Sequence, residues 1–396
     1  MVIKIARTLE LPDPVRLARY ERTPDLGPKI LFFSGGSALR KVCYELIRYT
    51  HNSIHLITPF DSGGSSAKIR DAFKMLAIGD VRNRLLALAD RSLLGNPEIF
   101  KLFAYRFPKD GDQEKMAREL DRMIEGSHKL VASIPDPMRK IICHHTRLFK
   151  EHMPDDFDLC KASIGNLILA GGFLENRHHL DPVIFIFSKL VQVRGIVRPV
   201  VNQFLHLIAE MEDGEVVVGQ HMITGKEVSP ISSKIRRVYI SRSRKHPKPA
   251  NIPIRNKMGQ LISEAELICY PIGSFYSSLI ANLLPRGVGT AVSQNPCPKI
   301  FIPNSAEDPE LYGHDLNDQV RLLIEYLKQD APEGTLPSDF LNFIILDEKH
   351  KGYPGQLDED EMRQMGIEII RCPLISQETA PYIDEKRLVP VLLSLT

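Results

Sequence analysis

The feature that most constrains the fold is a short apolar run followed by a glycine turn, a helical segment and a second apolar run. Residues 29–33 are mostly apolar and lead into a turn at 34–37 that contains two glycines. Apolar residues then recur at helical spacing between Leu39 and Ile47, and residues 53–57 have the pattern of another strand. Strand, turn, helix and strand in this order open a Rossmann-like unit. We therefore predict an α/β fold in which helices cover both faces of a mostly parallel sheet, with ligands at the carboxyl ends of its strands.

The chain divides into segments with different patterns. Residues 1–28 contain four prolines and predict an irregular leader. The strand and helix pattern over 29–305 predicts the main α/β domain. Within it, residues 97–160 carry charged and apolar side chains at helical spacing, which indicates a helical insertion. Residues 306–396 predict a C-terminal α/β extension packed on the same sheet.

Composition narrows the classes of partner. The 51 Lys and Arg residues nearly balance the 49 Asp and Glu residues, and because nucleic-acid-binding domains are usually strongly basic, no nucleic acid is expected as a partner. No uninterrupted apolar stretch is long enough to span a bilayer, so no membrane is expected either. The six cysteines form no Cys-x-x-Cys pair, which favours buried thiols in a reducing, cytoplasmic compartment. One dense cationic run, 234–245, is interpreted either as a solvated strand edge or as a phosphate clamp.

The segment 58–70, which follows the second predicted strand, concentrates the chemistry. It can bring backbone N–H groups, hydroxyls and positive charge to one anionic ligand. The residues expected to contact a phosphate ligand here are Gly63, Gly64, Ser65, Ser66 and Arg70. Asp61 is the candidate for a contact with Mg²⁺ or substrate, because Mg²⁺ favours oxygen ligands; the alternative is an aspartate that only caps a helix or turn. Arg70 is either a clamp for phosphate or a solvated helix charge.

Two further motifs are candidates for the same ligand. Asp80, Arg82 and Asn83 follow Gly79 where a loop enters a predicted helix. An arginine fork matches a phosphate bidentately, while a purely structural Asp–Arg pair is the alternative. Asn166 either contacts the ligand or caps its own helix.

The ends of two predicted strands supply the remaining candidates. Gly273, Ser274 and Tyr276 lie where a strand gives way to a helix, which suits phosphate binding by the helix N-terminus. Tyr276 either contacts the ligand, by stacking on a base or bonding to a sugar, or packs in the core. The turn after the first strand contributes Gly35, Gly36 and Ser37.

Taken in order, these motifs resemble one family. The segments that carry the resemblance are 34–37, 61–66, 79–83, 164–166, 210–214 and 273–276. Over residues 29–305 they are similar to the CofD/YvcK family. One branch of this family comprises 2-phospho-L-lactate transferases of deazaflavin cofactor biosynthesis, and the other comprises gluconeogenesis factors, regulatory proteins that bind a nucleotide sugar. The resemblance implies an aspartate at position 61 near the donor phosphate and the acceptor, and a homodimer. The family often has a second aspartate before the glycine pair, where this chain has Ser62.

The resemblance leaves two functions open. The first is an Mg²⁺-assisted transferase that moves a phosphate-containing group, such as 2-phospho-L-lactate, from a nucleotide-linked donor to an acceptor hydroxyl. Asp61 is then the catalytic and metal-binding residue. The second is a regulatory protein that binds a nucleotide sugar in the same site without catalysis. The transferase is our working hypothesis, and a nucleotide ligand is expected in either case.

Overall fold

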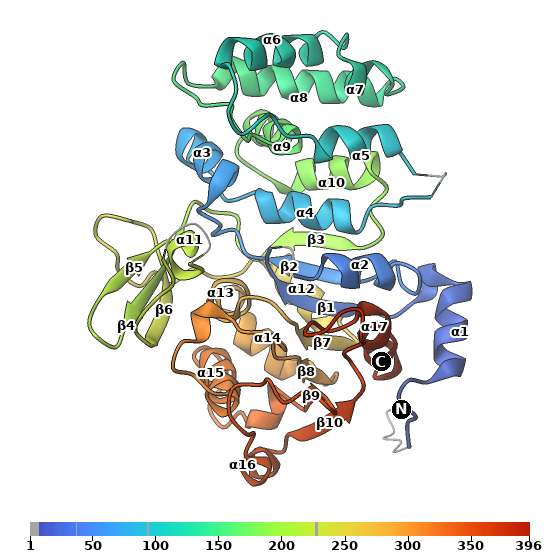
Figure 1. The fold of residues 1–396 in the computed structure, drawn as a ribbon, viewed down its shortest axis with the longest axis vertical. Coiled ribbons are helices and arrows are strands. Elements are labelled where there is room, and N and C mark those ends of the chain that lie inside the picture. The colour runs from blue at the N-terminus through green and yellow to red at the C-terminus, as the bar shows by residue number, and fades with distance from the viewer. Residues whose placement is uncertain (1–7, 37, 93–94, 226–228) are drawn as a thin grey trace.

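The computed structural model describes residues 8–36, 38–92, 95–225 and 229–396. The centre of this part of the chain is a seven-stranded sheet in which neighbouring strands all pair in parallel (Figure 1). The strand order is β10 (Glu368–Cys372), β9 (Phe343–Asp347), β8 (Lys299–Phe301), β7 (Leu267–Tyr270), β1 (Ile30–Ser34), β2 (Ile54–Ile57) and β3 (Ile196–Pro199). The predicted α/β fold with a mostly parallel sheet is confirmed.

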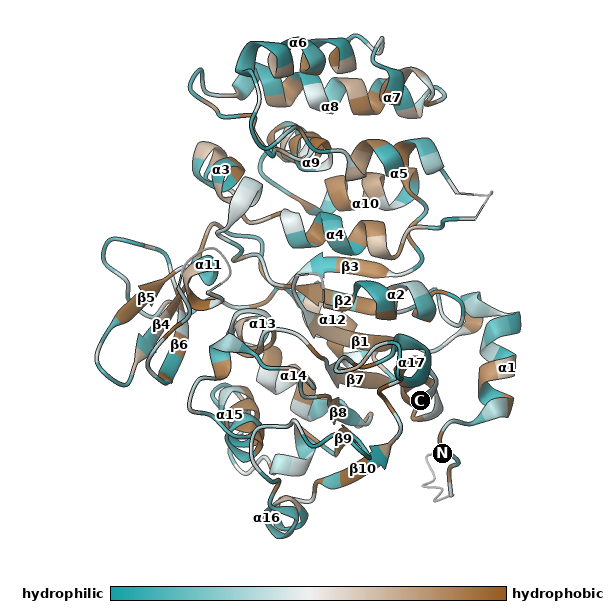
Figure 2. Cartoon of the chain, in the orientation of Figure 1, coloured by the Kyte–Doolittle hydropathy of each residue, from teal (hydrophilic) through white to brown (hydrophobic). Residues whose placement is uncertain are grey.

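The central strands are buried on both faces, and an apolar core lies on each side of the sheet. Ile30 and Phe32 of β1 belong to one core, whereas Leu31 and Phe33 belong to the other, because successive side chains of a strand point to opposite faces. The first core is closed by α2 (Arg40–Leu46), α4 (Gly79–Ala87) and α17 (Glu385–Ser394). The second core is closed by α12 (Asn256–Ser263), α14 (Val288–Gln294) and α15 (Leu316–Lys328). Figure 2 shows hydrophobic residues concentrated in the strands between these helices.

A stack of helices covers the β3 edge of the sheet (Figure 1). Its members are α5 (Pro97–Ala104), α6 (Gln113–Ile124), α7 (Lys129–Ala132), α8 (Met138–His152), α9 (Ile164–Glu175) and α10 (Asp181–Leu190). Leu120 of α6 and Phe149 of α8 are fully buried in the first core. The helices of segment 97–160 are thereby joined to the main body by apolar packing.

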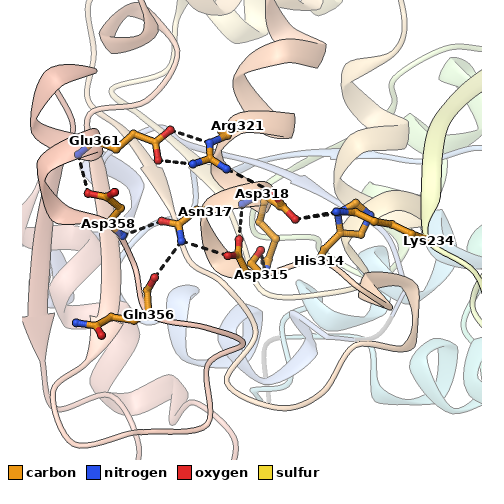
Figure 3. A network of polar contacts seen from close by, with 10 residues as sticks. Lys234, His314, Asp315, Asn317, Asp318, Arg321, Gln356, Asp358 and Glu361 are labelled. Carbon is orange, nitrogen blue, oxygen red and sulfur yellow. Dashed lines mark hydrogen bonds and ion pairs between the residues drawn. The ribbon is translucent and has the colours of Figure 1, made fainter. Parts of the chain in front are cut away.

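A small antiparallel sheet stands beside the large one (Figure 1). Its strands are β5 (Val216–Val218), β4 (His206–Met211) and β6 (Ile235–Ser241), and the short helix α11 (Gln220–Ile223) follows β5. A polar network joins this sheet to α15 and α16 (Glu359–Gln364), as Figure 3 shows. In it, Lys234 Nζ lies 3.0 Å from Asp318 Oδ2, and Arg321 pairs with Glu361.

The prolines of the N-terminal leader predicted an irregular segment, but part of the leader is helical. Residues Pro14–Arg22 form helix α1, with Pro14 at its first position, where the missing N–H costs nothing. Asp13 caps the helix by accepting hydrogen bonds from two N–H groups of its first turn. The helix is then held by the far end of the chain, because the Asp13 N–H donates to Ser394 Oγ at 2.7 Å.

The remaining helices are short, except α3, which has 10 residues. They are η1 (Pro24–Leu26), α3 (Gly64–Phe73), the π-helix η2 (Phe275–Ile280), α13 (Ala281–Leu283), η3 (Pro309–Leu311) and η4 (Pro337–Asp339). None of the helices in the described ranges is long and apolar enough to cross a lipid bilayer.

Candidate functional site

A cleft of about 1260 Å³ opens at the carboxyl ends of β1, β2, β7 and β8. Gly35 follows β1, Asp61 follows β2, Gly273 follows β7 and Asn304 follows β8. Because these strands are parallel, their carboxyl ends meet at one edge of the sheet, where open α/β folds bind ligands. The predicted site residues that line the cleft are Gly35, Gly36, Asp61, Gly63, Gly64, Ser65, Ser66, Asp80, Asn83, Gly273 and Ser274. Ser37, also predicted, lies outside the described residues.

Three helices begin at the cleft. α2, α3 and α4 start at Arg40, Gly64 and Gly79, all of which line it. The first N–H groups of a helix have no partner within the helix, and the helix dipole favours an anion there. The starts of α3 and α4 lie so close together that a Cβ on Gly79 would stand 2.3 Å from Ser66 Oγ and 3.4 Å from Asp61 Oδ2. Glycine at position 79 therefore lets the two helix N-termini meet.

Two carboxylates border these helix starts. Asp61 Oδ1 accepts a hydrogen bond from the Gly63 N–H at 3.1 Å, which fixes the turn that leads into α3. Asp80 is buried in the first turn of α4, and its Oδ2 lies 3.2 Å from where a Cβ on Gly35 would stand. Across the described ranges, no three His, Cys, Asp or Glu side chains gather closely enough to hold a metal ion. The donor set therefore fits Mg²⁺ only together with phosphate oxygens, which is how proteins usually bind Mg²⁺ beside nucleotides.

Three cations in the cleft were missed in the sequence. Arg40 and Lys41 lie at the start of α2, shortly after the glycine turn, and this proximity could have revealed them. Arg106 follows α5, and its guanidinium donates to Ser65 Oγ at 3.2 Å. Its own surroundings in the sequence carry no signal, because only the folded chain brings it to α3. These charges favour a phosphate beside the helix N-termini.

Arg70 does not line the cleft. Its side chain is fully buried and donates at 2.8 Å to the carbonyl oxygens of Phe60 and Asp61, and also to that of Leu205. Burial lowers its pKa to about 10, so the guanidinium stays charged at neutral pH. This geometry gives Arg70 a supporting role beneath the Asp61 loop in place of the predicted ligand contact.

Arg82 and Asn166 also lie behind the cleft wall. Arg82 is buried and donates to Ser163 Oγ and to Asn83 Oδ1; burial, followed by the nearby charge of Arg106, lowers its pKa to about 9. Asn166 is 1% exposed, and neither polar atom of its side chain has a partner among the described residues. Of the four residues predicted in these two motifs, Asp80 and Asn83 line the cleft, whereas Arg82 and Asn166 do not.

The predicted phosphate-binding turn before η2 is occupied by groups of the protein itself. The Gly273 N–H donates to Asn304 Oδ1 at 2.8 Å, and the Phe275 N–H donates to Asp308 Oδ2 at 2.8 Å. The Tyr276 N–H donates to Glu310 Oε2 at 2.9 Å. These N–H groups are thus already bonded to side chains of the protein itself, so a ligand phosphate does not bind them in this conformation.

Glu310 and Tyr276 are both fully buried behind that turn. Burial, with the neighbouring carboxylate of Asp308 second, raises the pKa of Glu310 to about 8, against hydrogen bonds from Ser277 that favour the charged form. The Tyr276 hydroxyl lies 2.9 Å from His314 Nε2. Of the two interpretations that the sequence left open for Tyr276, the core packing is the one the structure shows.

The small sheet also reaches the cleft. Gln220 and His221 of α11, with Thr224, line it. His221 Nδ1 lies 2.7 Å from the hydroxyl of Ser62, the residue beside Asp61. This contact ties the small sheet to the Asp61 loop. It could not be predicted from the sequence, because the two residues come from separate segments.

The cationic run 234–245 lies outside the cleft. Most of it forms β6, where the exposed Arg236 and Arg237 both bond to Glu210. Arg244, farther along, pairs with Asp71. None of these residues lines the cleft, so the structure supports a solvated strand edge rather than a phosphate clamp.

Comparison with known proteins places these features in a family. The family model described as 2-phospho-L-lactate transferase CofD matches residues 30–375, which extends beyond residue 305, where the resemblance stated from the sequence ends. The gluconeogenesis factor of Bacillus subtilis (strain 168) is 28% identical over 362 residues, which cover 88% of this chain and 92% of that protein. The gluconeogenesis factor of Listeria monocytogenes is 29% identical over 358 residues, covering 89% of this chain and 90% of that one.

A solved structure gives the same answer for the fold. The crystal structure of a UPF0052 family member from Bacillus halodurans matches with a TM-score of 0.65 at 23% identity, covering 93% of this chain and 99% of that chain. At this level of identity the likeness concerns the fold alone. Because the family model spans most of the sequence, including the loops that follow β1, β2, β7 and β8 at the cleft, this chain belongs to the CofD family.

Proposed function

We propose that this protein is a CofD-like transferase that holds a nucleotide-linked donor by its phosphates and moves a phosphate-containing group to an acceptor hydroxyl. The observation that supports the proposal most directly is the close meeting of the α3 and α4 N-termini beside Asp61 and Asp80. The cations Arg40, Lys41 and Arg106 line the same cleft. Helix N-termini, cations and carboxylates together suit a diphosphate with an accompanying metal ion.

In the proposed reaction, the acceptor oxygen attacks the phosphorus atom that is farther from the nucleoside. A new P–O bond forms to the acceptor, and the bond from that phosphorus to the bridging oxygen breaks. The nucleoside monophosphate leaves with the electron pair of that bond, and the hydroxyl proton passes to the Asp61 carboxylate. The helix N–H groups and Arg106 hold the phosphate oxygens. Such transfers depend mainly on positioning and charge stabilisation.

Mg²⁺ is the ion that the family resemblance implies. Asp61 and Asp80 are the residues that would hold it, together with phosphate oxygens of the donor. When bound, the ion neutralises charge on those oxygens.

The test of the transferase uses purified protein, MgCl₂, a nucleotide-linked 2-phospho-L-lactate donor and a deazaflavin acceptor. Release of nucleoside monophosphate is followed with time. We expect turnover by the wild type and a loss of about a hundredfold or more in Asp61→Asn. Asp71→Asn is the control, because Asp71 is an exposed aspartate of α3 outside the cleft and its ion pair with Arg244 contributes little. Donor binding without product formation would contradict catalysis.

A regulatory nucleotide-sugar-binding protein is the second candidate. Two observations favour it: the relatives described above are named gluconeogenesis factors, and Ser62 stands where the family often has a second aspartate. This function predicts that a nucleotide sugar binds in calorimetric titrations while no donor is consumed. If neither class of ligand binds or raises the melting temperature, both candidates fail, because a ligand that binds only the folded state must stabilise it.

A further inference from the structure

A segment near the C-terminus supplies one wall of the cleft. We call residues 376–385, which lie between β10 and α17 and end with the first residue of α17, the C-terminal strap. Its residues that line the cleft are Glu378, Thr379, Ala380, Tyr382, Ile383 and Glu385. The family model ends at residue 375, so this wall lies beyond the family match. In Figure 1 the strap and α17, in dark red, lie close to α2 and β7.

The strap is held firmly on both sides. Asp347 Oδ2, at the end of β9, accepts hydrogen bonds from the N–H groups of Leu374 at 2.7 Å and Ile375 at 2.8 Å. The Asp384 N–H donates to Leu374 O at 2.8 Å and ties the end of the strap to the residues that precede its start. α17 then buries Leu388 and other apolar residues in the first core. A wall that is already ordered loses little entropy when a ligand binds against it.

Tyr382 gives the strap an aromatic surface. Among the described residues that line the cleft, it is the only Phe, Tyr or Trp. The residue is 64% exposed, so its ring is open to a ligand, whereas Tyr276 is fully buried. Any nucleobase can stack on such a ring, because every base has a π-face.

The strap also differs in charge from the phosphate-binding loops. It brings Glu378 and Glu385 but no cation to the cleft. In contrast, Arg40 lies at the start of α2, and Arg106 donates to Ser65 in the first turn of α3. Carboxylates repel phosphates, but they accept hydrogen bonds from sugar hydroxyls.

From these observations we infer that the C-terminal strap recognises the nucleoside of the ligand. Tyr382 stacks on the base, and Glu378 and Glu385 accept hydrogen bonds from ribose hydroxyls. The diphosphate lies at the starts of α3 and α4. The inference rests on the proposed function, because it concerns the same cleft. It assigns to the strap the distinction between a nucleotide and a bare diphosphate.

The experiment compares a nucleoside diphosphate, either GDP or UDP, with inorganic pyrophosphate. Binding of each is measured by calorimetry in the presence of Mg²⁺. For the nucleotide that the wild type binds, we expect Tyr382→Ala to weaken affinity about tenfold or more, while pyrophosphate affinity stays unchanged. Tyr382→Phe keeps the ring and should bind like the wild type. Tyr312→Ala is the matched control, because Tyr312 is 55% exposed and lies outside the cleft. Melting temperatures of all variants establish that they are folded.

The outcomes separate the inference from the proposed function. Nucleotide binding that Tyr382→Ala leaves intact would overturn the role of the strap and leave the proposed function standing. Equal weakening of nucleotide and pyrophosphate would also overturn it, because the strap would then not act on the nucleoside. If the wild type binds neither probe, the proposed function and the strap inference both fail. Glu378→Gln provides a second readout: it should weaken binding of the ribonucleotide more than that of its 2′-deoxy counterpart.

Discussion

At the scale of single residues, the cleft depends on a glycine where two helices start. A Cβ on Gly79 would stand 2.3 Å from Ser66 Oγ, which is far closer than a van der Waals contact. We expect Gly79→Ala to lower the free energy of unfolding by about 1–3 kcal/mol through overpacking. It should also weaken nucleotide binding, because the Ser66 hydroxyl, which lies at the cleft, must be displaced. Urea denaturation and calorimetric titration measure the two effects.

Gly259 provides the matched control for this substitution. It lies inside α12, and nothing stands within 4 Å of where its Cβ would be. Gly259→Ala should therefore stabilise the protein by roughly 0.5–1 kcal/mol. If Gly79→Ala were as well tolerated as Gly259→Ala, the close meeting of the two helices would be wrong.

Arg70 allows a test that distinguishes support from ligand contact. Its guanidinium bonds to the carbonyl oxygens of Phe60, Asp61 and Leu205, and lysine cannot reach all three. We expect Arg70→Lys to lower the free energy of unfolding by about 1–3 kcal/mol, because buried acceptors lose their donors. Weaker ligand binding at unchanged stability would instead support the direct contact predicted from the sequence.

At the scale of secondary-structure elements, β4 begins with a histidine that is neutral in the folded protein. Burial, followed by the charges of Arg70 and Arg244, lowers the pKa of His206 to about 4 from an ordinary value of 6.5. Arg244 Nε donates to His206 Nδ1 at 3.0 Å, which requires that nitrogen to be unprotonated. As the pH falls through this interval, the unfolded chain binds a proton that the folded chain does not, so stability is lost.

The expected contribution of His206 is at most about 3 kcal/mol of unfolding free energy between the two pKa values. This stabilisation should be fully present above the ordinary pKa of 6.5 and fully lost below the folded-state pKa of about 4. Urea denaturation across this pH range measures it, and His206→Gln should remove that part of the slope. An identical pH dependence in the variant would contradict the neutral, buried histidine.

The elements of the large sheet could be predicted because their cause is local. Strands buried on both faces read as apolar runs, and the turns that follow them carry glycine. Helix α1 could not be predicted in this way. Its cap and first-turn proline are local signals, but its stability also comes from contacts with residues near Ser394, far along the chain.

In the candidate site too, features with a local cause could be predicted and features with a long-range cause could not. Loops that follow strands, such as Asp61–Ser66, are contiguous in the sequence and were found there. Arg106, His221 and the strap were missed, because the fold alone brings these separate segments to the cleft. For Arg70 and Tyr276 the sequence placed the residue near the right strand end, but it does not reveal which way a side chain points.

At the scale of the whole molecule, Asp318 of α15 joins the small sheet to this helix through the network in Figure 3. Its Oδ2 lies 3.0 Å from Lys234 Nζ, beside β6, and 3.7 Å from His314 Nδ1. We expect Asp318→Asn to weaken this junction by about 1 kcal/mol and to increase amide hydrogen exchange in β4 and β6. Because α11 follows β5, nucleotide binding should weaken slightly as well.

Glu361→Gln is the control for the junction. Glu361 belongs to the same network, but it pairs with Arg321 between α15 and α16 and does not contact the small sheet. Amide hydrogen exchange in β4 and β6 of the Glu361→Gln variant should match that of the wild type. Equal exchange in both variants would mean that the network does not hold the small sheet in place.

The order of strands also constrains how the molecule is assembled. β1 lies between β2 and β7, and Ile30 pairs with Leu267. The middle of the sheet can therefore close only after a segment from the second half of the chain docks beside its first strand. Pairing over such sequence separation slows folding, and until β7 docks, β1 presents an apolar edge with unpaired backbone groups. A fragment that ends before Leu267 should thus aggregate rather than form a smaller version of the protein.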